Sequence, residues 1–255
     1  MLVSVIMPTY NCGRYIEESI RSVQAQTMTD WELQIVDDAS TDNTREVLAP
    51  YLEADPRIHY ECLSANQGPA AARTEALKRA SGRYVAFLDS DDIWYPDKLE
   101  KQIAFMEAKG VPFSCTAYRL MSADGEDRHT ALFPPEKVDY KRCIRLSNPI
   151  GNLTVMYDQE ALGRFEVPPI RKRNDFALWL QVLKKTPYCA GMPEVLAAYR
   201  QGREGSVSRN KLAQARYHWQ LYHEIEGHGA LRSACEVLCW AVVKTTGVGV
   251  TRRRV

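Results

Sequence analysis

Short apolar runs rich in β-branched and aromatic residues alternate with longer amphipathic segments over the first half of this 255-residue chain. The runs predict strands, and the segments, whose apolar residues recur at helical spacing, predict helices. The expected strands cover residues 3–7, 32–36, 57–60, 84–88 and 113–118, and the expected helices cover residues 13–27, 41–52, 69–80 and 96–108. This order of elements predicts an α/β fold with a doubly wound, mostly parallel sheet.

The pattern is less regular beyond residue 118. Residues 119–150 contain a polar turn and a Pro-Pro pair, and we expect them to form a loop-rich excursion that faces a substrate. A strand is expected at 153–157, a helix at 175–184, an extended segment at 194–199 and a polar loop at 202–208. Residues 210–245 have the apolar spacing of a helical extension.

Three polar clusters directly follow three of the expected strands. They are PTYN at residues 8–11, DDAS at 37–40 and DSDD at 89–92. Doubly wound sheets bind ligands at the carboxyl ends of their parallel strands, which is where these clusters fall. Each cluster alone also fits an ordinary turn, because Asp, Ser and Asn are common helix caps. Three clusters at one edge, two of them doubly acidic, together favour a ligand site.

The third cluster gathers three carboxylates, Asp89, Asp91 and Asp92, within four positions. Like charges this close raise one another's pKa values, so the segment needs either a bound cation or full hydration. Carboxylate oxygens with open coordination positions fit Mg²⁺ or Mn²⁺, which also bind substrate phosphates. A solvated, capped turn is one alternative. Another is the D-x-D nucleophile motif of haloacid-dehalogenase-like phosphatases, with Asp89 as the nucleophile, although that motif normally follows the first strand of its fold.

The composition argues against several classes of protein. Hydrophobic residues make up 45% of the chain, enough for a large core, and a formal net charge of +1 gives no global field that would attract nucleic acid. Seven cysteines without a CxxC pair argue against a disulfide framework or a structural zinc site and favour the cytoplasm. The first residues do not have the pattern of a signal peptide, and no apolar run is long enough to span a membrane.

Four stretches, in order, resemble family 2 glycosyltransferases with the GT-A fold. They are VSVIMPTYNCGRYIEESIRSV, WELQIVDDASTDNT, NQGPAAARTEAL and GRYVAFLDSDD. They are similar to the family's opening strand with its P-x-Y-N turn, its D-D-x-S-x-D-x-T turn, its N-x-G-x-x-x-A-R segment and its DxD strand. The resemblance is close over residues 1–110 and implies an enzyme that transfers a sugar from a nucleotide-sugar.

The resemblance also implies roles for individual residues. The nucleotide site would be built by Pro8, Thr9, Tyr10, Asn11, Asp37, Asp38, Arg73, Asp89 and Ser90, with Asp37 supporting the turn that carries Asp38. Within this site, Tyr10 would stack near the base, Asp38 would hydrogen-bond the base, and Arg73 would lie near the diphosphate. Asp91, together with Asp89, would hold a divalent ion, Mn²⁺ or Mg²⁺.

Members of this kind invert the anomeric centre, and they need a general base on the acceptor side. The segment RKRNDFALWL places Asn174 and Asp175 just before an amphipathic helix, where the family carries an acidic pair. Asp175 is therefore the candidate base, although Asn174 departs from the acidic pair. The alternative role of Asp175 is that of a helix N-cap.

Four other side chains have two interpretations each. Arg200 and Arg203 would either close on the diphosphate or belong to a basic surface loop. Trp94 and Trp179 would either stack on sugar rings or pack in the core.

The resemblance implies transfer of one sugar at a time, because the Q-x-x-R-W motif and the membrane spans of processive members are absent. The expected donor is a UDP-sugar, and the expected acceptor is a saccharide or polyprenyl-linked saccharide used in assembling a surface polysaccharide. We expect a GT-A catalytic domain over 1–208, with a nucleotide-sugar half at 1–110 and an acceptor half at 111–208, followed by a helical tail at 209–255. A phosphatase and a non-catalytic nucleotide-sugar-binding protein are the alternatives.

The tail is basic. From Arg209 onward eight basic residues stand against three acidic ones, a formal charge of +5, whereas the preceding residues carry −4. An apolar run at 237–243 lies next to Lys244 and the cluster at 252–254. Such a pattern favours peripheral contact with anionic lipid at the inner face of the plasma membrane. Packing against the catalytic domain or a dimer contact would use the same residues.

Overall fold

The computed structural model describes residues 2–146, 148–202, 211–246 and 251–254. Its strands are β1 (Val3–Thr9), β2 (Trp31–Asp37), β3 (Ile58–Cys62), β4 (Tyr84–Phe87), β5 (Ile93–Trp94), β6 (Phe113–Met121), β7 (Asp127–Phe133), β8 (Lys137–Val138), β9 (Met156–Asp158), β10 (Cys189–Arg200) and β11 (Thr251–Arg254). Its α-helices are α1 (Ile16–Gln24), α2 (Thr44–Ala54), α3 (Pro69–Arg79), α4 (Lys98–Lys109), α5 (Tyr140–Leu146), α6 (Gln159–Leu162), α7 (Asn174–Leu183), α8 (Lys211–Gln220) and α9 (Ala230–Thr246). A 3₁₀ turn, η1 (Asn152–Thr154), and a π-helical turn, η2 (Leu221–Ile225), complete them.

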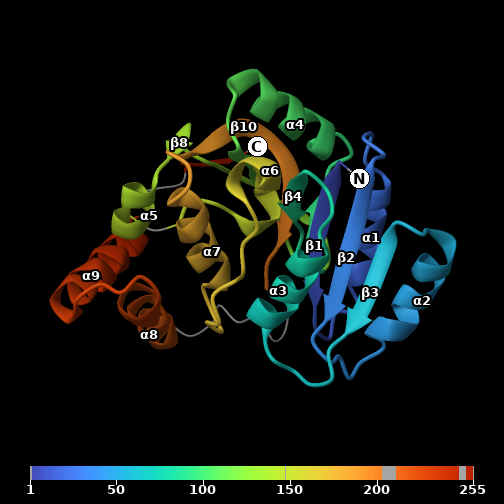
Figure 1. Cartoon of the computed structure of the whole chain (residues 1–255), viewed down its shortest axis with the longest axis horizontal. Coiled ribbons are helices and arrows are strands. Elements are labelled where there is room, and N and C mark those ends of the chain that lie inside the picture. Colours follow the sequence, from blue (N-terminus) through green and yellow to red (C-terminus); the bar gives the residue numbers. More distant parts are fainter. Residues whose placement is uncertain (1, 147, 203–210, 247–250, 255) are drawn as a thin grey trace.

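The centre of the sheet is parallel, as the sequence predicts. β1 pairs in parallel with both β2 and β4, and β3 continues the arrangement beyond β2. Every residue of β1, β2 and β4 is buried, because helices cover both faces of this part of the sheet. The strands β1, β2 and β3 all point toward the lower edge of the molecule in Figure 1. The polar clusters that follow β1, β2 and β4 therefore meet at that edge.

Alternate residues of the central strands contribute to two separate apolar clusters. Ile6, Val36 and Phe87 belong to a cluster that includes α3 and α7. Val5 and Met7 belong to a second cluster that includes α1 and α4. Successive side chains of a strand point to opposite faces, so the central strands bury apolar side chains on both sides. Their continuous apolar runs follow from this double burial.

The other half of the sheet is mixed. From β4 the order continues β9-β6-β7-β11, all in antiparallel pairs, while β10 runs parallel to β6 and also pairs with β5 and β8. The expected loop-rich excursion over 119–150 is wrong, because this region contains β7, β8 and α5. The predicted strand at 153–157 is also displaced, since η1 occupies its first residues and β9 begins at Met156. Short antiparallel pairs of this kind depend on partners distant in sequence, which local pattern does not reveal.

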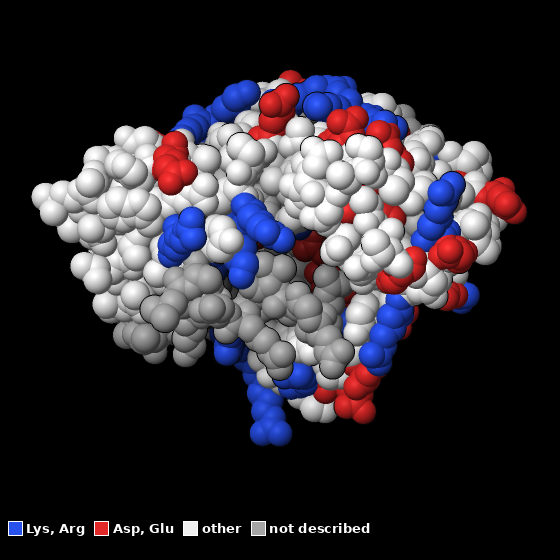
Figure 2. All heavy atoms as spheres, turned by 90° about the horizontal axis from the view of Figure 1, so that it is seen from below, with Lys and Arg blue, Asp and Glu red and all other residues white. Residues whose placement is uncertain are grey.

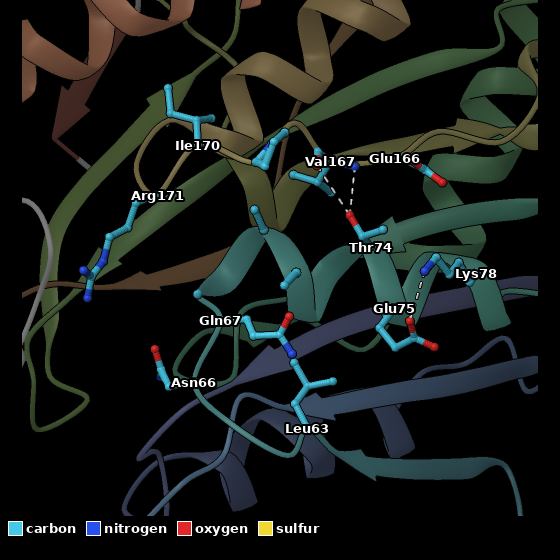
Figure 3. Close-up of a pocket in the computed structure, with 14 residues that line it drawn as sticks. Leu63, Asn66, Gln67, Thr74, Glu75, Lys78, Glu166, Val167, Ile170 and Arg171 are labelled. Atoms are coloured by element: carbon cyan, nitrogen blue, oxygen red, sulfur yellow. Dashed lines mark hydrogen bonds and ion pairs between the residues drawn. The ribbon is translucent and has the colours of Figure 1, made fainter.

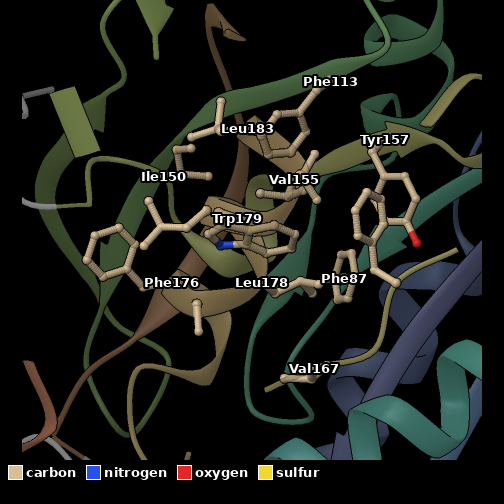
Figure 4. Packing of buried hydrophobic residues seen from close by; sticks show 14 of the residues in the cluster. Phe87, Phe113, Ile150, Val155, Tyr157, Val167, Phe176, Leu178, Trp179 and Leu183 are labelled. Atoms are coloured by element: carbon tan, nitrogen blue, oxygen red, sulfur yellow. The ribbon is translucent and has the colours of Figure 1, made fainter. Parts of the chain in front are cut away.

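Two tryptophans considered as sugar platforms pack in the core instead. Trp179 is fully buried at the centre of the aromatic cluster in Figure 4, edge-on to Phe87 with ring centroids 4.9 Å apart. Trp94 is 2% exposed, and its indole N–H donates to the backbone oxygen of Leu153 at 2.7 Å. Neither indole lines the cavity of the candidate site. Both side chains therefore stabilise the sheet rather than offer a surface to a ligand.

The C-terminal region is mainly helical, as expected, but it ends in a strand. α9 buries Ser233, Glu236 and Trp240 against the domain, while Leu231 and Leu238 on another face are 82% and 66% exposed. The last described segment, β11, pairs antiparallel with β7 and forms one end of the sheet order. The domain boundary expected at 208/209 lies outside the described residues. No helix in the described ranges combines the length and the apolar character that crossing a membrane requires.

Candidate active site

The turn after β1 is fastened to the turn after β2 by side-chain hydrogen bonds. Asn11 adopts a left-handed backbone conformation, with φ of 48°, and its side-chain oxygen accepts from the backbone N–H of Thr41 at 2.8 Å. Oδ2 of Asp42 accepts from the N–H of Gly13 at 3.0 Å, and the hydroxyl of Thr44 accepts from the N–H of Cys12 at 2.9 Å. The polar residues of the two motifs thus hold the two turns in one fixed arrangement.

The two acidic residues after β2 have different positions. Oδ1 of Asp37 accepts from the N–H and the hydroxyl of Ser40 at 2.9 and 2.6 Å, and Oδ2 accepts from the Tyr60 hydroxyl at 3.0 Å. Asp37 is 1% exposed, and these hydrogen bonds let it support the turn from inside the protein. Asp38 lines the cavity, and its two oxygens accept from the backbone N–H groups of Gln67 and Gly68 at 2.7 and 2.8 Å. This pair of bonds ties the turn after β2 to the start of α3.

Arg73 on α3 joins helix α7 to the turn at residues 89–92 after β4, which is called the acidic turn from here on. Its guanidinium donates to Oδ1 of Asp89 at 2.5 Å and, through the other terminal nitrogen, to Oδ1 of Asn174. Burial lowers the pKa of this 8%-exposed arginine, but the nearby carboxylates of Asp89, Asp175 and Asp91 outweigh that effect and raise it. Arg73 is therefore a permanent positive charge among three carboxylates, which reduces their mutual repulsion.

The acidic turn has a second cation behind it. Arg200 ends β10 and is 3% exposed, with its backbone N–H donating to Oδ1 of Asp92 at 2.9 Å and its Nε donating to the backbone oxygen of Asp91 at 2.9 Å. Its other two nitrogens donate to Ala123 and Glu18 at 3.0 and 2.6 Å. All three guanidinium nitrogens of Arg200 donate hydrogen bonds. Arg200 therefore holds the acidic turn in place and is not part of a surface loop. Arg203 lies outside the described residues.

Asp92 differs from the other two carboxylates of the turn because it is buried at 1% exposure. Burial, followed by repulsion from Asp91 and Asp89, raises the pKa of Asp92 well above its ordinary value. Its Oδ2 has no hydrogen-bond partner in the described part of the chain. Asp92 thus serves the turn as a buried structural carboxyl, while Asp89 and Asp91 line the cavity.

Asp175 lies in the first turn of α7 and lines the same cavity. The helix begins at Asn174, and the N-cap position is Arg173, which has φ of 64° and caps the helix with no side-chain hydrogen bond. The N-cap alternative for Asp175 is therefore wrong. Asn174 accepts from Arg73 and donates to the backbone oxygen of Arg171 at 3.4 Å. An amide makes both contacts, whereas an ionised carboxylate would only accept, which explains why Asn fits this position.

One cavity of about 550 Å³ brings most of the expected site residues together. Those that line it are Pro8, Thr9, Tyr10, Asp38, Arg73, Asp89, Ser90, Asp91 and Asp175. Asn11 and Asp37 do not line it, because their side chains hold the turns in place. Figure 2 views this edge of the sheet, with acidic atoms deep in a hollow and basic side chains beside it. Donors, acceptors and charges from five separate segments thus converge on one space.

Several site residues escaped the sequence interpretation. The side-chain amide of Asn152 donates to Oδ1 of Asp89 at 3.1 Å, so a residue 63 positions away helps to orient that carboxylate. Tyr199, Gln214 and Tyr217 line the cavity from β10 and α8. Tyr199 stands next to Arg200, which the resemblance had placed near the diphosphate, whereas nothing in the local pattern marks Asn152, Gln214 or Tyr217. The regular spacing of Asp42 and Thr44 in the second motif could have indicated their role in the turn.

A second cavity of about 540 Å³ lies alongside α3 (Figure 3). Its walls come from α3 and from the segment before α7, which are joined where the backbone N–H of Val167 donates to the Thr74 hydroxyl at 3.0 Å. Asn66, Gly68 and Arg171 line both cavities, so the two are neighbours. Its lining has none of the clustered carboxylates of the first cavity, and we place the chemistry in the first.

A divalent ion fits the acidic turn by the chemistry of its donors. Asp89 and Asp91 are hard oxygen donors that line one cavity. Both side-chain contacts of Asp89 described above use Oδ1, so neither occupies Oδ2. The described residues contain no group of three or more His, Cys, Asp or Glu side chains placed to hold a metal. A site with two carboxylates suits Mg²⁺ or Mn²⁺ that takes its remaining ligands from water and substrate phosphates.

The fold is that of the GT-A class of glycosyltransferases. Residues 4–179 match the family model described as glycosyl transferase family 2, so the chain belongs to that family and is a glycosyltransferase. It is 48% identical over 225 residues, 88% of either chain, to TuaG of Bacillus subtilis, a glycosyltransferase assigned to teichuronic acid biosynthesis. It is 37% identical, over 86% of its length and 85% of the relative, to WfgD of Escherichia coli, a UDP-Glc:α-D-GlcNAc-diphosphoundecaprenol β-1,3-glucosyltransferase.

Solved structures agree with the fold at low sequence identity. Staphylococcus aureus TarS 1–349 in complex with UDP-GlcNAc matches with a TM-score of 0.72 and 22% identity, over 96% of this chain and 72% of that one. The mannosyltransferase PcManGT of Pyrobaculum calidifontis, in complex with GDP-Man and Mn²⁺, matches with a TM-score of 0.66 and 19% identity, over 97% and 75%. The GT-A architecture predicted from the sequence is therefore confirmed.

Proposed function

We propose that this glycosyltransferase moves one sugar from a UDP-sugar to a saccharide acceptor, with inversion at the anomeric carbon and with the help of a divalent ion. The observation that carries the proposal is the single cavity that holds the nucleotide-side turns, Asp89 and Asp91, and Asp175 together. Neither alternative function accounts for this combination. A phosphatase nucleophile at Asp89 would leave Asp38 and Asp175 without a role, and a non-catalytic binder would not need Asp175.

The donor end of the cavity is built by the turns after β1 and β2. Tyr10 is 42% exposed at this end, where a flat aromatic ring can stack on a nucleobase. Asp38 lines the same wall, and an aspartate there can accept from the N–H group of a uracil ring. Arg73 supplies a fixed positive charge near the diphosphate. Asp89 and Asp91 would hold the ion, which when bound neutralises charge that develops on the leaving diphosphate.

Asp175 is the proposed general base. Its carboxylate lines the cavity at the start of α7, on an element that Arg73 and Asn174 fix relative to the acidic turn. In an inverting transfer the acceptor hydroxyl attacks the anomeric carbon from the side opposite the leaving diphosphate. Asp175 would accept the proton of that hydroxyl as the bond to carbon forms.

The proposed acceptor is a saccharide linked to a lipid carrier, made for a surface polysaccharide. The support is the 37% identity to WfgD, whose name specifies an acceptor carried on diphosphoundecaprenol, and the 48% identity to TuaG. The exposed apolar residues of α9 and the basic residues of β11 support peripheral contact with an anionic membrane. We also propose the division into a catalytic domain at 1–208 and a tail at 209–255.

A thermal-shift panel tests the donor and the ion. UDP, GDP, CDP and UDP-sugars would each be added with and without Mn²⁺ to the wild type, to Asp91→Ala and to the control Asp30→Ala, which changes an exposed carboxylate away from the cavity. A ligand at 100 times its Kd stabilises a protein by about 2.7 kcal/mol. We expect a shift with UDP that requires Mn²⁺, persists in Asp30→Ala and disappears in Asp91→Ala. The absence of a shift with every nucleotide would contradict the proposal.

Asp175→Asn separates catalysis from donor binding. We expect the variant to keep the UDP-dependent shift and to lose sugar transfer by a factor of about 10²–10⁴, because only the proton acceptor is removed. Transfer would be measured as UDP release from a panel of UDP-sugars with a diphosphate-linked GlcNAc acceptor. Wild-type turnover that survives the substitution would remove Asp175 from the mechanism. A wild type that binds UDP but never transfers would favour the non-catalytic alternative.

A further inference from the structure

Three consecutive basic residues, Arg171, Lys172 and Arg173, line the active-site cavity directly before α7. Arg171 is exposed, whereas Lys172 and Arg173 are partly buried. They directly precede α7, which carries Asp175 in its first turn. The proposed function assigns no task to these three charges.

The two arginines of this group take no part in the ion pairs that the described residues form around the cavity. The ion pairs of the region join Arg73 to Asp89 and Arg200 to Glu18, and within the described ranges none involves Arg171 or Arg173. Arg173 donates to the neutral side-chain oxygen of Gln214 at 3.2 Å. The ammonium of Lys172 lies 5.5 Å from the ring centre of Tyr217. Clustered arginines without a carboxylate partner on a cavity wall are suited to bind an anion, and planar guanidinium groups match the oxygens of phosphates in particular.

We propose that Arg171, Lys172 and Arg173 bind the diphosphate of the acceptor, a lipid-linked saccharide; this rests on the proposed function. Two peptide units separate Arg173 from Asp175, so their Cα atoms lie at most about 7.6 Å apart. If the basic group holds the diphosphate of the acceptor, the sugar that reaches Asp175 is one close to that diphosphate and not one far along the saccharide. The enzyme accordingly acts early in the assembly of a chain, on an acceptor with one or two sugars between the diphosphate and the attacked hydroxyl.

The donor also carries a diphosphate, but the geometry assigns that group to other residues. Arg73 is buried among Asp89, Asp91 and Asp175, deep in the site, where the proposed divalent ion would also bind. Arg171 instead lies at the border between the two cavities and lines both. Figure 3 shows its side chain at one end of the second cavity, away from Thr74 and Glu75. A group bound there has access from outside, as an acceptor attached to a long lipid requires.

Calorimetric titration with three ligands distinguishes the two diphosphates. The probes are GlcNAc-α-diphosphoryl-decane, the decyl glycoside of GlcNAc without the diphosphate, and UDP, each titrated in the presence of Mn²⁺ into the full chain. The test variant is Arg171→Gln/Arg173→Gln, and the control is Arg45→Gln, an exposed arginine on α2. We expect the double variant to lose at least about tenfold in affinity for the diphosphoryl probe. Its affinities for UDP and for the decyl glycoside should stay within about twofold of the wild type.

Three results would overturn the inference. An equal loss of affinity for UDP would assign the basic group to the donor diphosphate. Unchanged affinity for every probe would leave the group without a role in binding. A wild type that binds UDP but not the diphosphoryl probe would refute this inference and leave the proposed donor intact, whereas a wild type that does not bind UDP would refute the proposed function itself. Unfolding curves of each variant, compared with the wild type, exclude misfolding as the cause.

Discussion

At the scale of single residues, Arg73 explains how the acidic turn is tolerated at the end of a buried strand. Its guanidinium is surrounded by the carboxylates of Asp89, Asp91 and Asp175 and also holds Asn174. One positive charge on α3 thus binds both the acidic turn and α7, although Asp89 and Asn174 are 85 positions apart in the sequence. A substitution of Arg73 should therefore affect both the stability of the protein and the geometry of the site.

Replacing Arg73 by Met should lower the free energy of unfolding by about 3 kcal/mol, because it removes a buried charge and leaves the partly buried Asp89 without its ion-pair partner. Denaturant unfolding monitored by circular dichroism measures the change. The matched control is Arg83→Met. It breaks an ion pair with Asp158 in which the arginine side chain is 42% exposed, and it should destabilise the protein much less than Arg73→Met does. Equal losses of unfolding free energy in the two variants would show that the charge of Arg73 is no more important for stability than that of an exposed arginine.

Lys98 is a buried lysine that the active site does not use. It is fully buried, its ammonium lies 4.5 Å from the ring centre of Trp94, and it donates to Oε1 of Gln102 at 2.5 Å. Burial lowers the pKa of Lys98 from 10.5 to about 7. Between these values the unfolded chain binds a proton that the folded chain does not, so this residue makes the protein more stable as the pH rises.

The expected outcome is a difference in pH dependence between the wild type and Lys98→Met. From pH ~7.5 to ~9.5 the free energy of unfolding of the wild type should rise relative to the variant by about 1 kcal/mol per pH unit. Comparing the two proteins at each pH cancels the other groups that titrate in this range. Parallel curves for the two proteins would mean that Lys98 keeps an ordinary pKa in the fold.

At the scale of elements, β10 depends on the close approach of another segment. The N–H of Gly191 donates to the backbone oxygen of Glu136 at 2.8 Å, and a Cβ built on Gly191 would lie 2.0 Å from the backbone oxygen of Pro135. The segment at Pro135 and Glu136 can therefore pack this closely against β10 only because residue 191 has no side chain. This contact fixes the region between β7 and α5 against the sheet.

Gly191→Ala should lower the free energy of unfolding by at least about 2 kcal/mol, since backbone atoms must move to admit the methyl group. Gly229→Ala is the matched control, because a Cβ there meets no atom within 4 Å, and it should change stability by less than about 0.5 kcal/mol. Thermal unfolding of both variants measures the difference. A neutral Gly191→Ala would show that the segment before β8 adjusts freely.

The strand β11 offers a second explanation for the arginines of the tail. It is the outermost strand on the path from β3 to β11, and Arg252, Arg253 and Arg254 are all exposed. Charged residues on an edge strand discourage pairing with another molecule. The apolar face of α9 is thus the feature that a membrane contact would chiefly use. Leu231, Cys235, Leu238 and Val242 recur there at intervals of three or four residues, the spacing of one helix face.

At the scale of the whole molecule, the proposed membrane contact can be tested on the two parts of the tail separately. We expect the wild type to sediment with phosphatidylglycerol vesicles at low salt, and less so at high salt, because attraction to anionic lipid is screened. Leu231→Ser/Leu238→Ser should abolish most of this binding, since burying each leucine is worth about 1.5–3 kcal/mol. Replacement of the three β11 arginines by Gln should weaken it less, and Arg45→Gln should not change it.

Two other results would contradict the membrane contact. Equal binding of the wild type and the leucine variant to vesicles would exclude the α9 face as the contact. A concentration-dependent dimer that the same leucine variant dissolves would assign this face to a second copy of the chain. Sedimentation velocity across a range of protein concentrations detects that dimer.

The sequence by itself determined the parallel half of the sheet and most of the donor side of the site. The strands are marked by continuous apolar runs because both of their faces are buried, and their carboxyl ends must share one edge. The sequence therefore places Asp38, Asp89 and Asp91 together at that edge. The supporting role predicted for Asp37 is also confirmed, since its carboxylate accepts from the backbone N–H of Ser40, three residues further on.

Only the tertiary structure decided which distant residues complete the site. Asn152 reaches Asp89 across 63 positions, and Arg200 reaches Glu18 across 182, through pairings that depend on the whole sheet. The strands β7, β8 and β11 likewise escaped prediction, because short antiparallel strands derive their stability from neighbours and not from their own apolar pattern. The position of Arg171, Lys172 and Arg173 on the cavity wall belongs to this second kind of information. In the sequence they are three charges before a helix, and only the fold shows that they line the same cavity as Asp175.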